Sequence, residues 1–400
     1  MKVHHIWLIG AVAIASTFPA WAQRDSGYDS SVVSQVRIDL RDLGYPPVDV
    51  IPSGESEIRA LAVAPDGRIY GATSGERSHL FVLDPQHGYV EPLGTLPDAK
   101  VVHHSLDVSQ QGDVYIGTSL GIDNSGRGYD QYGGGHLLKY APGEDTARKR
   151  IRTNTPCPVK DLGIPVPGQS IYTLMIDQIH GIVYGLTYPD GEFFSYAIES
   201  GVAKTHGRVA KHLIPGEKFE TEKDIGRALA VDREGNVFTS GEGGRFYRFA
   251  RKTQQLESLE IRVPAVPGRE VYNRVDAWAF DTNGNLYGGT SDGYLFSLDP
   301  VKLQVRNLGK PLNQYRIRGL VLGRNGKFYG IGGDDDEMAR LFSYDPGGGV
   351  YELLGMIDVN RRPYYSWQGY VFDAMVIGLD GTVYMGQAER KSRLYLYFPP

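Results

Sequence analysis

The sequence predicts an all-β protein, a seven-bladed β-propeller. One apolar strand–turn–strand pattern recurs seven times along the chain. The composition of 51 Gly, 26 Tyr and 14 Phe in 400 residues suits many short strands joined by tight turns. Further strands follow each copy at a period of roughly 40–65 residues, which is typical of propeller blades.

The first 22 residues are predicted to be a secretory signal peptide. Lys2 precedes an apolar run, and "AWA" at 20–22 fits a small-x-small cleavage site before Gln23. The run is too short for a membrane anchor, and we find no other segment that could span a bilayer. We therefore expect an exported protein, periplasmic or secreted, whose residues 23–400 form one domain.

Each repeat begins with an apolar strand, an Asp-Gly or Asn-Gly type turn, and a strand ending in Tyr-Gly or a similar pair. Such turns are a strong signal for a β-hairpin. Third strands such as "HLFVLDP" follow every copy, and fourth strands such as "YVEPLGTLP" follow most of them. The seven copies cover residues 58–74, 103–119, 171–188, 226–242, 275–291, 317–333 and 371–387.

The last repeat ends at "LYLYFPP" after only three strands. The segment 36–47, "VRIDLRDLGYPP", matches the pattern of a fourth strand. We expect this N-terminal strand to complete the last blade and close the ring, which removes open sheet edges. An eight-bladed ring would need another copy that the sequence lacks.

Charge and cysteine content narrow the range of partners and cofactors. The net charge of −5 and the pI of about 6.1 argue against nucleic acid or an anionic membrane as a partner. Cys157 is the single cysteine, so no internal disulfide forms, and no partner spacing for a metal accompanies it. The acidic run at 334–337 is expected to be a solvated loop, with calcium binding as the alternative.

Aligning the first strands places one polar residue of each copy near the central channel. Because side chains alternate along a strand, His104 should face the channel mouth and His103 should point away. A second polar register begins the third strands. The first register contains Arg59, His104, Tyr172, Arg227, Asp276, Arg318 and Asp373, and the second contains His79, His136, Glu192, Arg245, Tyr294, Arg340 and Arg393. Polar channel lining and arginine–carboxylate pairs are the simpler explanation of both.

Four residues of the second and third repeats suggest catalysis instead: His104, His136, Tyr188 and Arg208. They lie at or near strand ends and are predicted to converge at one mouth. Cationic and imidazole donors can bind a uronic-acid carboxylate and stabilise the enediolate that forms when the C5 proton leaves. Tyr188 or a histidine would remove that proton. Arg208 would favour the phenolate and lower the pKa of Tyr188.

Two other functions stay open. A glycoside hydrolase needs two carboxylates, and the sequence offers Asp276, Asp373 and Glu192 without singling out a pair. A propeller that only binds a glycan or a protein is the third hypothesis. Trp278 and Trp367 are candidate platforms for sugar rings; Trp278 lies in an apolar strand and is expected in the core, which favours Trp367.

The motifs "HHSLDV" and "YGGGHLLKY", followed by "YGLTYPDGEFFSY" and "HGRV", resemble the seven-bladed polysaccharide lyases typified by ulvan lyases. Related propellers cleave rhamnose–glucuronate linkages, some as lyases and some as hydrolases. The resemblance implies that His104 and His136 bind and neutralise the uronate, that Tyr188 transfers the proton, and that Arg208 holds the carboxylate or tunes the tyrosine.

The resemblance also implies an acidic polysaccharide or oligosaccharide as substrate. No cofactor is expected for the chemistry, and a structural zinc or calcium ion fits the family. We expect a monomer. The residues expected to contact the substrate are Arg59, Tyr172, Arg227, Arg245 and Trp367.

Overall fold

The computed structural model describes most of the chain after residue 50. The described residues are 38–39, 51–121, 128–146, 155–211, 222–334, 337–361, 365–389 and 392–400. The predicted signal peptide lies outside them.

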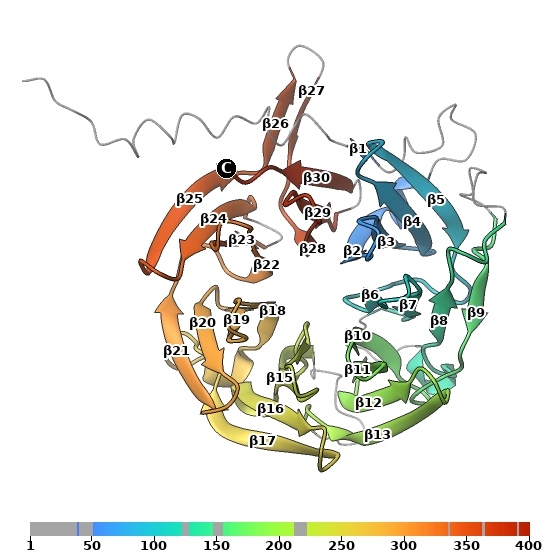
Figure 1. The fold of residues 1–400 in the computed structure, drawn as a ribbon, viewed down its shortest axis with the longest axis horizontal. Helices are drawn as coiled ribbons and strands as arrows, with labels where there is room; N and C mark the ends of the chain where they lie inside the picture. Colours follow the sequence, from blue (N-terminus) through green and yellow to red (C-terminus); the bar gives the residue numbers. More distant parts are fainter. Residues whose placement is uncertain are drawn as a thin grey trace, which may run out of the picture.

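Seven four-stranded sheets surround a central channel, which confirms the predicted propeller (Figure 1). The first strand of each blade is innermost and the fourth is outermost. Blades 1 to 3 comprise β2 (Glu57–Val63), β3 (Ile69–Ser74), β4 (His79–Asp84) and β5 (Tyr89–Thr95); β6 (Leu106–Val108), β7 (Val114–Gly117), β8 (Leu137–Tyr140) and β9 (Val159–Asp161); and β10 (Ser170–Asp177), β11 (Ile182–Tyr188), β12 (Glu192–Ala197) and β13 (Val202–Arg208). Blades 4 to 6 comprise β14 (Ala230–Val231), β15 (Val237–Gly241), β16 (Arg245–Ala250) and β17 (Gln255–Arg262); β18 (Val275–Phe280), β19 (Leu286–Thr290), β20 (Leu295–Asp299) and β21 (Gln304–Gly309); and β22 (Ile317–Leu322), β23 (Phe328–Gly332), β24 (Arg340–Asp345) and β25 (Val350–Met356).

Blade 7 is built from both ends of the chain. It contains β28 (Phe372–Ile377), β29 (Val383–Gln387), β30 (Arg393–Tyr397) and, as its outermost strand, β1 (Ile38–Asp39). Ile38 pairs with Leu394 in antiparallel register. The predicted closure of the ring by the N-terminal segment is therefore confirmed at these two residues.

The turn between the first and second strands is alike in six blades, where the glycine N–H donates to the carbonyl three residues earlier, and it is one residue longer in blade 3, where Gly181 N donates to Asp177 O. It ends in a glycine whose φ lies between 63° and 91°, a region that side chains with a Cβ rarely adopt. This need explains the recurring Asp-Gly and Asn-Gly pairs. The seven glycines are Gly67, Gly112, Gly181, Gly235, Gly284, Gly326 and Gly381.

The Tyr-Gly pair of the second strand has a packing origin. In blade 6, Gly330 lies opposite Phe342 of the third strand, and a Cβ at Gly330 would lie 2.3 Å from the phenyl ring. Gly185 faces Phe194 in blade 3 in the same way, at 2.4 Å. The ring fills the space that the glycine leaves, so the Tyr-Gly motif recurs because the second and third strands pack closely at this position.

The core lies between neighbouring blades as well as within them. Ile58 and Phe81 of blade 1 pack in one buried cluster with Tyr384 and Leu394 of blade 7. Blade 1 therefore covers an apolar face of blade 7 across the closure of the ring.

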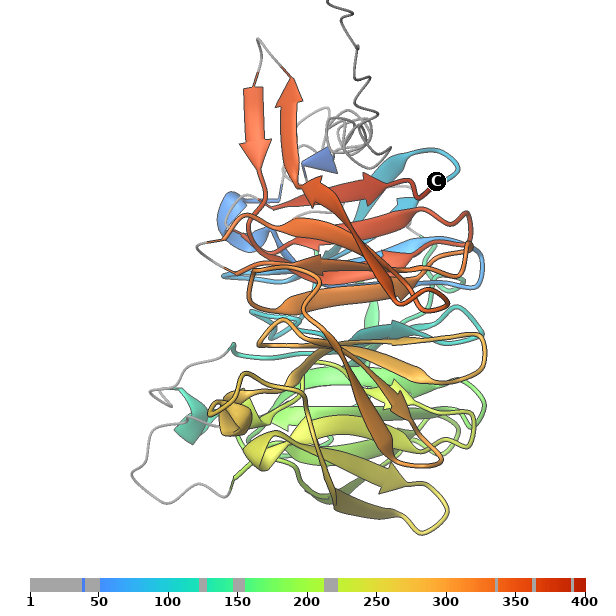
Figure 2. The same ribbon diagram turned by 90° about the vertical axis from the view of Figure 1, so that its left-hand side faces the viewer.

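Short 3-10 helices gather on one face of the ring, on the left in Figure 2. We call this the mouth face; there the first strand of each blade begins and the second ends. The helices are η3 (Ser53–Glu55), η4 (Tyr129–Gln131), η5 (Glu222–Asp224), η6 (Glu242–Gly244) and η7 (Glu270–Tyr272). A hairpin of β26 (Asp358–Arg361) and β27 (Tyr365–Gln368) projects outward beyond the ring (Figure 1).

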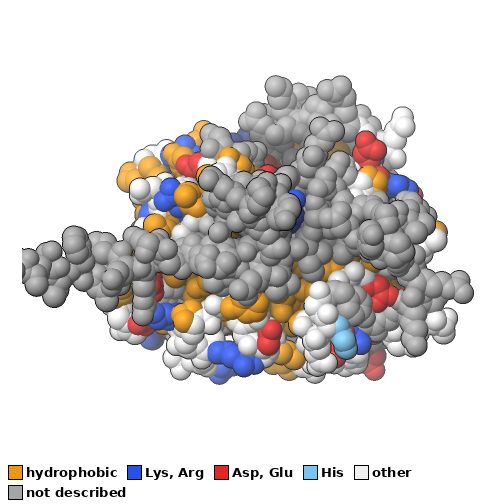
Figure 3. Space-filling model, turned by 90° about the horizontal axis from the view of Figure 1, so that it is seen from above, with side chains coloured by type: hydrophobic (Ala, Val, Ile, Leu, Met, Phe, Trp, Pro, Cys, Tyr) orange, Lys and Arg blue, Asp and Glu red, His pale blue; other side chains and the backbone are white. Residues whose placement is uncertain are grey.

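The rim seen in Figure 3 carries positive and negative side chains interspersed with apolar ones. Charge of one sign does not gather over its described residues. Within the described part of the chain, no helix has both the length and the apolar character needed to cross a membrane.

Candidate functional site at the mouth of the channel

β-Bulges present the polar residues of the first register to the channel. In five blades the pairing of first and second strands skips one residue, and that residue belongs to the register predicted from the sequence. A bulge leaves the extra residue unpaired and re-aims its side chain. The skipped residues are Arg59, Tyr172, Asp276, Arg318 and Asp373.

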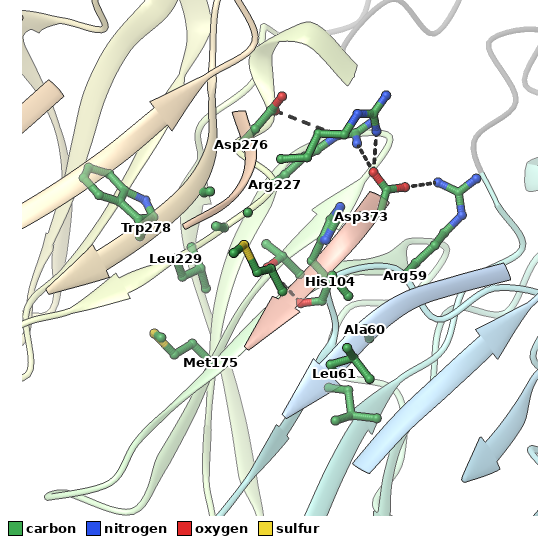
Figure 4. Close-up of a pocket in the computed structure, with 18 of the residues that line it drawn as sticks. Arg59, Ala60, Leu61, His104, Met175, Arg227, Leu229, Asp276, Trp278 and Asp373 are labelled. Carbon is green, nitrogen blue, oxygen red and sulfur yellow. Dashed lines mark hydrogen bonds and ion pairs between the residues drawn. The ribbon is translucent and has the colours of Figure 1, made fainter. Parts of the chain in front are cut away.

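The remaining two members, His104 and Arg227, stand just before strands β6 and β14. His103 and His104 were expected at the start of the first strand of blade 2, and they lie just before that strand. Every member of the register except Tyr172 lines a cavity of about 200 Å³ inside the channel (Figure 4). The prediction that His104 faces the channel is confirmed, while His103 is 4% exposed and its ring is tilted against the Tyr172 ring with 5.0 Å between centroids.

Asp373 binds three arginines from three other blades. Its Oδ2 accepts a hydrogen bond from Arg59 Nη1 at 2.7 Å, and its Oδ1 accepts from Arg227 Nη1 at 3.1 Å and from Arg318 Nη1 (Figure 4). The carboxylate is 0% exposed. Burial favours its protonated form, but the three guanidinium groups overcome this and hold the pKa of Asp373 well below its usual value.

Asp276 is a second buried centre of the same kind. Its side chain is 0% exposed and accepts from Arg274 Nε at 3.1 Å and Arg316 Nε at 2.9 Å. Arg227 Nε lies 3.9 Å away. Burial opposes ionisation here too, yet these arginines hold the pKa of Asp276 well below its usual value.

The two layers of this network differ in charge. The deep layer has five arginines around two fully buried carboxylates. The balancing carboxylates are Glu57, Glu222 and Asp334, whose side chains are 31%, 27% and 33% exposed at the rim. A cavity of about 630 Å³ opens between the layers. The buried layer alone has more arginines than carboxylates, and the rim carboxylates together with Glu389 offset this charge around the cavity, which we call the mouth cavity.

Arg316 is the least satisfied arginine of the deep layer. Its Nη2 is buried without a hydrogen-bond partner. Burial and neighbouring Arg227 lower the pKa of Arg316 to about 10, against the opposing effect of Asp276. The residue has a φ of 62°, a strained conformation for a side chain with a Cβ. An anion that reached Arg316 Nη2 would accept a hydrogen bond that this group does not make within the described structure.

His104 lies below Asp373 with a free ring nitrogen (Figure 4). Its backbone carbonyl accepts hydrogen bonds from Thr173 Oγ1 and Leu174 N, both at 3.1 Å, which attaches it to blade 3. Burial lowers the pKa of His104 to about 3, and Arg227 and Arg59 reinforce the shift against Asp373. The imidazole is therefore neutral near pH 7, and its buried Nε2 has no partner.

Aromatic rings extend from His104 into blade 3. Tyr172 lies 6.2 Å from the His104 ring and 6.4 Å from the Tyr188 ring, and Tyr129 lies 5.8 Å beyond, between centroids. Tyr172 and Tyr188 are each 1% exposed. The Tyr172 hydroxyl has no hydrogen-bond partner, and burial raises its pKa, so it is a neutral donor.

The other predicted catalytic residues lie farther from the channel axis on the same face. His136 precedes the third strand of blade 2, and its Nδ1 lies 2.8 Å from Asp161 Oδ2. Arg208 ends the outermost strand of blade 3 and pairs with Glu192 and with Asp190, the latter at 3.2 Å. Of the four predicted catalytic residues, only His104 lines the channel-side cavities bounded by described residues.

The predicted substrate-binding residues divide in the same way. Arg59 and Arg227 line both channel cavities. Arg245 starts the third strand of blade 4 and pairs with Glu260 at 3.1 Å, outside these cavities. Trp367 lies on β27, and its side chain is outside the described part of the structure. Trp278 is half-buried against Phe296, as expected for a core residue, but it also lines the inner cavity.

Sequence reasoning missed Glu222, Arg274 and Arg316. A signal existed for the two arginines, because they stand two positions before Asp276 and Arg318, and residues i and i+2 share a strand face. Glu222 lies on η5, where no repeat pattern applies. Within the described residues, no three His, Cys, Asp or Glu side chains gather as a metal site requires, so a structural ion has no assigned ligands.

No protein-family model and no curated protein matches the chain. Among solved structures, it is similar to a streptogramin B lyase, with 13% identity over 86% of this chain and 95% of that one and a TM-score of 0.60. A catalytically inactive virginiamycin B lyase variant from Staphylococcus aureus with quinupristin gives 9% identity, 86% and 96% coverage, and a TM-score of 0.60. A periplasmic gluconolactonase from Pseudomonas aeruginosa has 16% identity over 74% of this chain and 84% of that one, with a TM-score of 0.51. At these identities the likeness shows a shared propeller fold, in which the distant neighbours are lyases and a lactonase.

Proposed function

We propose that this protein is an exported lyase that cleaves a uronic-acid-containing glycan, with an ulvan-like or rhamnose–glucuronate linkage, by β-elimination. One observation carries the proposal: Arg59, Arg227 and Arg318 line both the mouth cavity and the inner cavity, and the inner cavity holds a neutral histidine with an unpartnered Nε2. Such a surface suits a ligand that brings a carboxylate and then loses a proton next to it.

The chemistry requires an arginine-rich site because the proton at C5 of a uronate is only weakly acidic. Removing it moves charge onto the carboxylate, forming an enediolate. Guanidinium groups already ordered by Asp276 and Asp373 stabilise that charge without reorganising. The C–H electron pair then forms the C4=C5 double bond as the glycosidic C4–O bond breaks.

We assign the roles by position. Arg316 and Arg227, whose Nη2 and Nε atoms respectively make no hydrogen bond, hold the substrate carboxylate. His104 Nε2 takes the C5 proton; the arriving anion offsets Arg227 and Arg59 and raises the basicity of the ring. The Tyr172 hydroxyl protonates the leaving oxygen. Tyr188, the base suggested by the family resemblance, stands next in the row of rings, and His136 and Arg208 would contact sugar units farther from the channel.

The alternative of a two-carboxylate hydrolase is less well supported. Asp276 and Asp373 are fully buried, and each is held ionised by arginines, so neither suits the role of general acid. Glu192 pairs with Arg208 away from both.

The structural neighbours favour a lyase with an essential histidine. The virginiamycin B lyase in complex with quinupristin is inactive after replacement of a histidine by alanine, so histidine chemistry occurs on this fold. Export of our protein is supported by its signal-like N-terminus and by the periplasmic location of the gluconolactonase neighbour.

The test is a screen of the mature protein against ulvan, gum arabic, gellan, pectate, alginate and heparinoids, followed by the ultraviolet absorbance of unsaturated uronate. We expect His104→Ala and Tyr172→Phe each to lower turnover by about 10²–10⁴-fold. Tyr188→Phe shows which tyrosine takes part in the proton transfer: a loss of turnover only in Tyr172→Phe assigns it to Tyr172. The control His87→Ala, at a histidine 65% exposed on a distant turn, should leave turnover unchanged. Cleavage without new absorbance, or binding without turnover, would reject the lyase assignment.

A further inference from the structure

A second cavity adjoins the mouth cavity on the side of blades 4 to 6. It has a volume of about 450 Å³, within the range of small-molecule sites. Glu222, Arg316 and Asp334 line both cavities, so they form the wall between them. A ligand that fills the mouth cavity can therefore extend into this neighbour, which we call the side cavity.

Two exposed tyrosines stand in the side cavity. Tyr272 is 55% exposed and Tyr315 is 46% exposed, although both belong to a residue type that is usually more deeply buried. Their backbones are fixed: Tyr272 N donates to Arg269 O at 2.9 Å, and Tyr315 N donates to Glu337 Oε2 at 3.0 Å. Rigid, exposed rings in a concavity offer apolar contact area at low entropic cost.

Cations lie against both rings. Lys223 Nζ is 4.8 Å from the Tyr272 centroid, and Lys310 Nζ is 5.3 Å from the Tyr315 centroid. The Arg269 guanidinium is 5.9 Å from the Tyr315 centroid. These distances are those of cation–π contacts. Each ring thus combines an apolar surface with a positive charge within reach of a ligand.

The carboxylates of the side cavity are already engaged by arginines. Glu222 pairs with Arg274 at 2.7 Å, Asp292 with Arg269 at 3.4 Å, and Asp334 with Arg318. They therefore orient the arginines and leave as the charges that meet a ligand Lys223, which lines the cavity, and Lys310, which lies between the Tyr315 and Tyr294 rings beside it.

We infer that the side cavity is a binding subsite for a further anionic sugar unit of the chain whose first uronate occupies the mouth cavity. The C–H face of the sugar packs on Tyr272 or Tyr315, and its acid group meets Lys223 or Lys310. The inference rests on the proposed function for the identity of the ligand, and it assigns a substrate longer than one sugar residue. A bare protein-binding surface would not require the adjoining cavity lined by four arginines.

The experiment is affinity electrophoresis of the mature protein in native gels that contain ulvan, pectate, alginate, gellan or gum arabic, with neutral dextran as the reference. We expect retardation by at least one acidic polymer and none by dextran. Tyr272→Ala and Tyr315→Ala should weaken this binding by about tenfold, the scale of removing an aromatic hot spot. Tyr272→Phe, which keeps the ring, should retain it.

Charge is tested in parallel. Lys223→Gln should weaken retardation and reduce its salt dependence, whereas Lys302→Gln, at a lysine 69% exposed on the opposite face, should change neither. Unchanged retardation in both alanine variants, or no retardation by any acidic polymer, would overturn the subsite. A dimer that Tyr272→Ala dissociates would show instead that this surface joins two copies of the chain.

The two proposals fail in different ways. If acidic polymer binds through Tyr272 and Tyr315 but no unsaturated product forms, the subsite stands and the lyase assignment falls. If product forms from the polymer at the same rate in Tyr272→Ala and Tyr315→Ala, the lyase assignment stands and the subsite falls.

Discussion

Replacing Asp373 by asparagine tests whether the arginine network holds the ring together. The change keeps the shape of the side chain and removes its charge. Arg59, Arg227 and Arg318 would then share no fully buried anion, although each binds Asp373 directly in the native protein. Breaking a buried ion pair by removing one partner costs about 3–5 kcal/mol. This is a large share of the roughly 5–15 kcal/mol that stabilises a typical domain.

The assay is urea unfolding followed by circular dichroism, with Asp66→Asn as the matched control. Asp66 is 54% exposed and pairs with Arg68 at 3.2 Å, so its loss should cost about 0–1 kcal/mol. The native pKa of Asp373 is depressed, so its stabilisation is present above the ordinary aspartate pKa and is lost as the pH falls below it. The difference between wild type and Asp373→Asn should therefore shrink below about pH 4. A loss at pH 7 no greater than that of Asp66→Asn would refute the reasoning.

Three further predictions concern packing, protonation and closure. Gly330→Ala places a Cβ 2.3 Å from Phe342 and should cost about 1–3 kcal/mol in urea unfolding, whereas Gly143→Ala, with no atom within 4 Å, should be neutral. His104 has a native pKa of about 3, below its unfolded value, so its contribution is complete above about pH 6.5 and declines as the pH falls toward 3. By pH 5 wild type should lose about 2 kcal/mol that His104→Gln retains; equal losses would contradict this. Deleting residues 1–50 removes β1 and exposes the edge of β30, so light scattering should report aggregation that the full chain lacks.

The repeat pattern predicted the fold because each of its signals has a local cause. The turn glycines are needed because the backbone there has a positive φ, and the glycine of each Tyr-Gly pair leaves room for an aromatic ring on the adjacent strand. The polar register was also predictable, since aligning the first strands identifies the equivalent residue position in every blade. Its projection into the channel depends on β-bulges, which sequence alignment does not reveal.

The arrangement of the candidate site was less predictable. Aligning the repeats shows where along its strand a residue lies, but it does not show how far that residue lies from the channel axis. His104 precedes an innermost strand, whereas His136 and Arg208 belong to the third and fourth strands of their blades. Residues on one face can therefore be widely spaced along a radius. Glu222 escaped prediction because it lies on a 3-10 helix outside the repeat, and its role appears only where arginines of blades 4 and 5 meet.

The position of Asp373 links the charge network to the order of assembly. Its partner Arg59 lies 314 residues earlier in the chain, on the innermost strand of the first blade. Until the final blade docks, the guanidinium groups of Arg59 and Arg318 repel their neighbours at the axis without a buried carboxylate of their own, because Asp276 binds Arg274 and Arg316. Completing the circle removes that repulsion and adds the most distant contacts at the same step, so an unfinished ring is disfavoured at its centre as well as at its open seam.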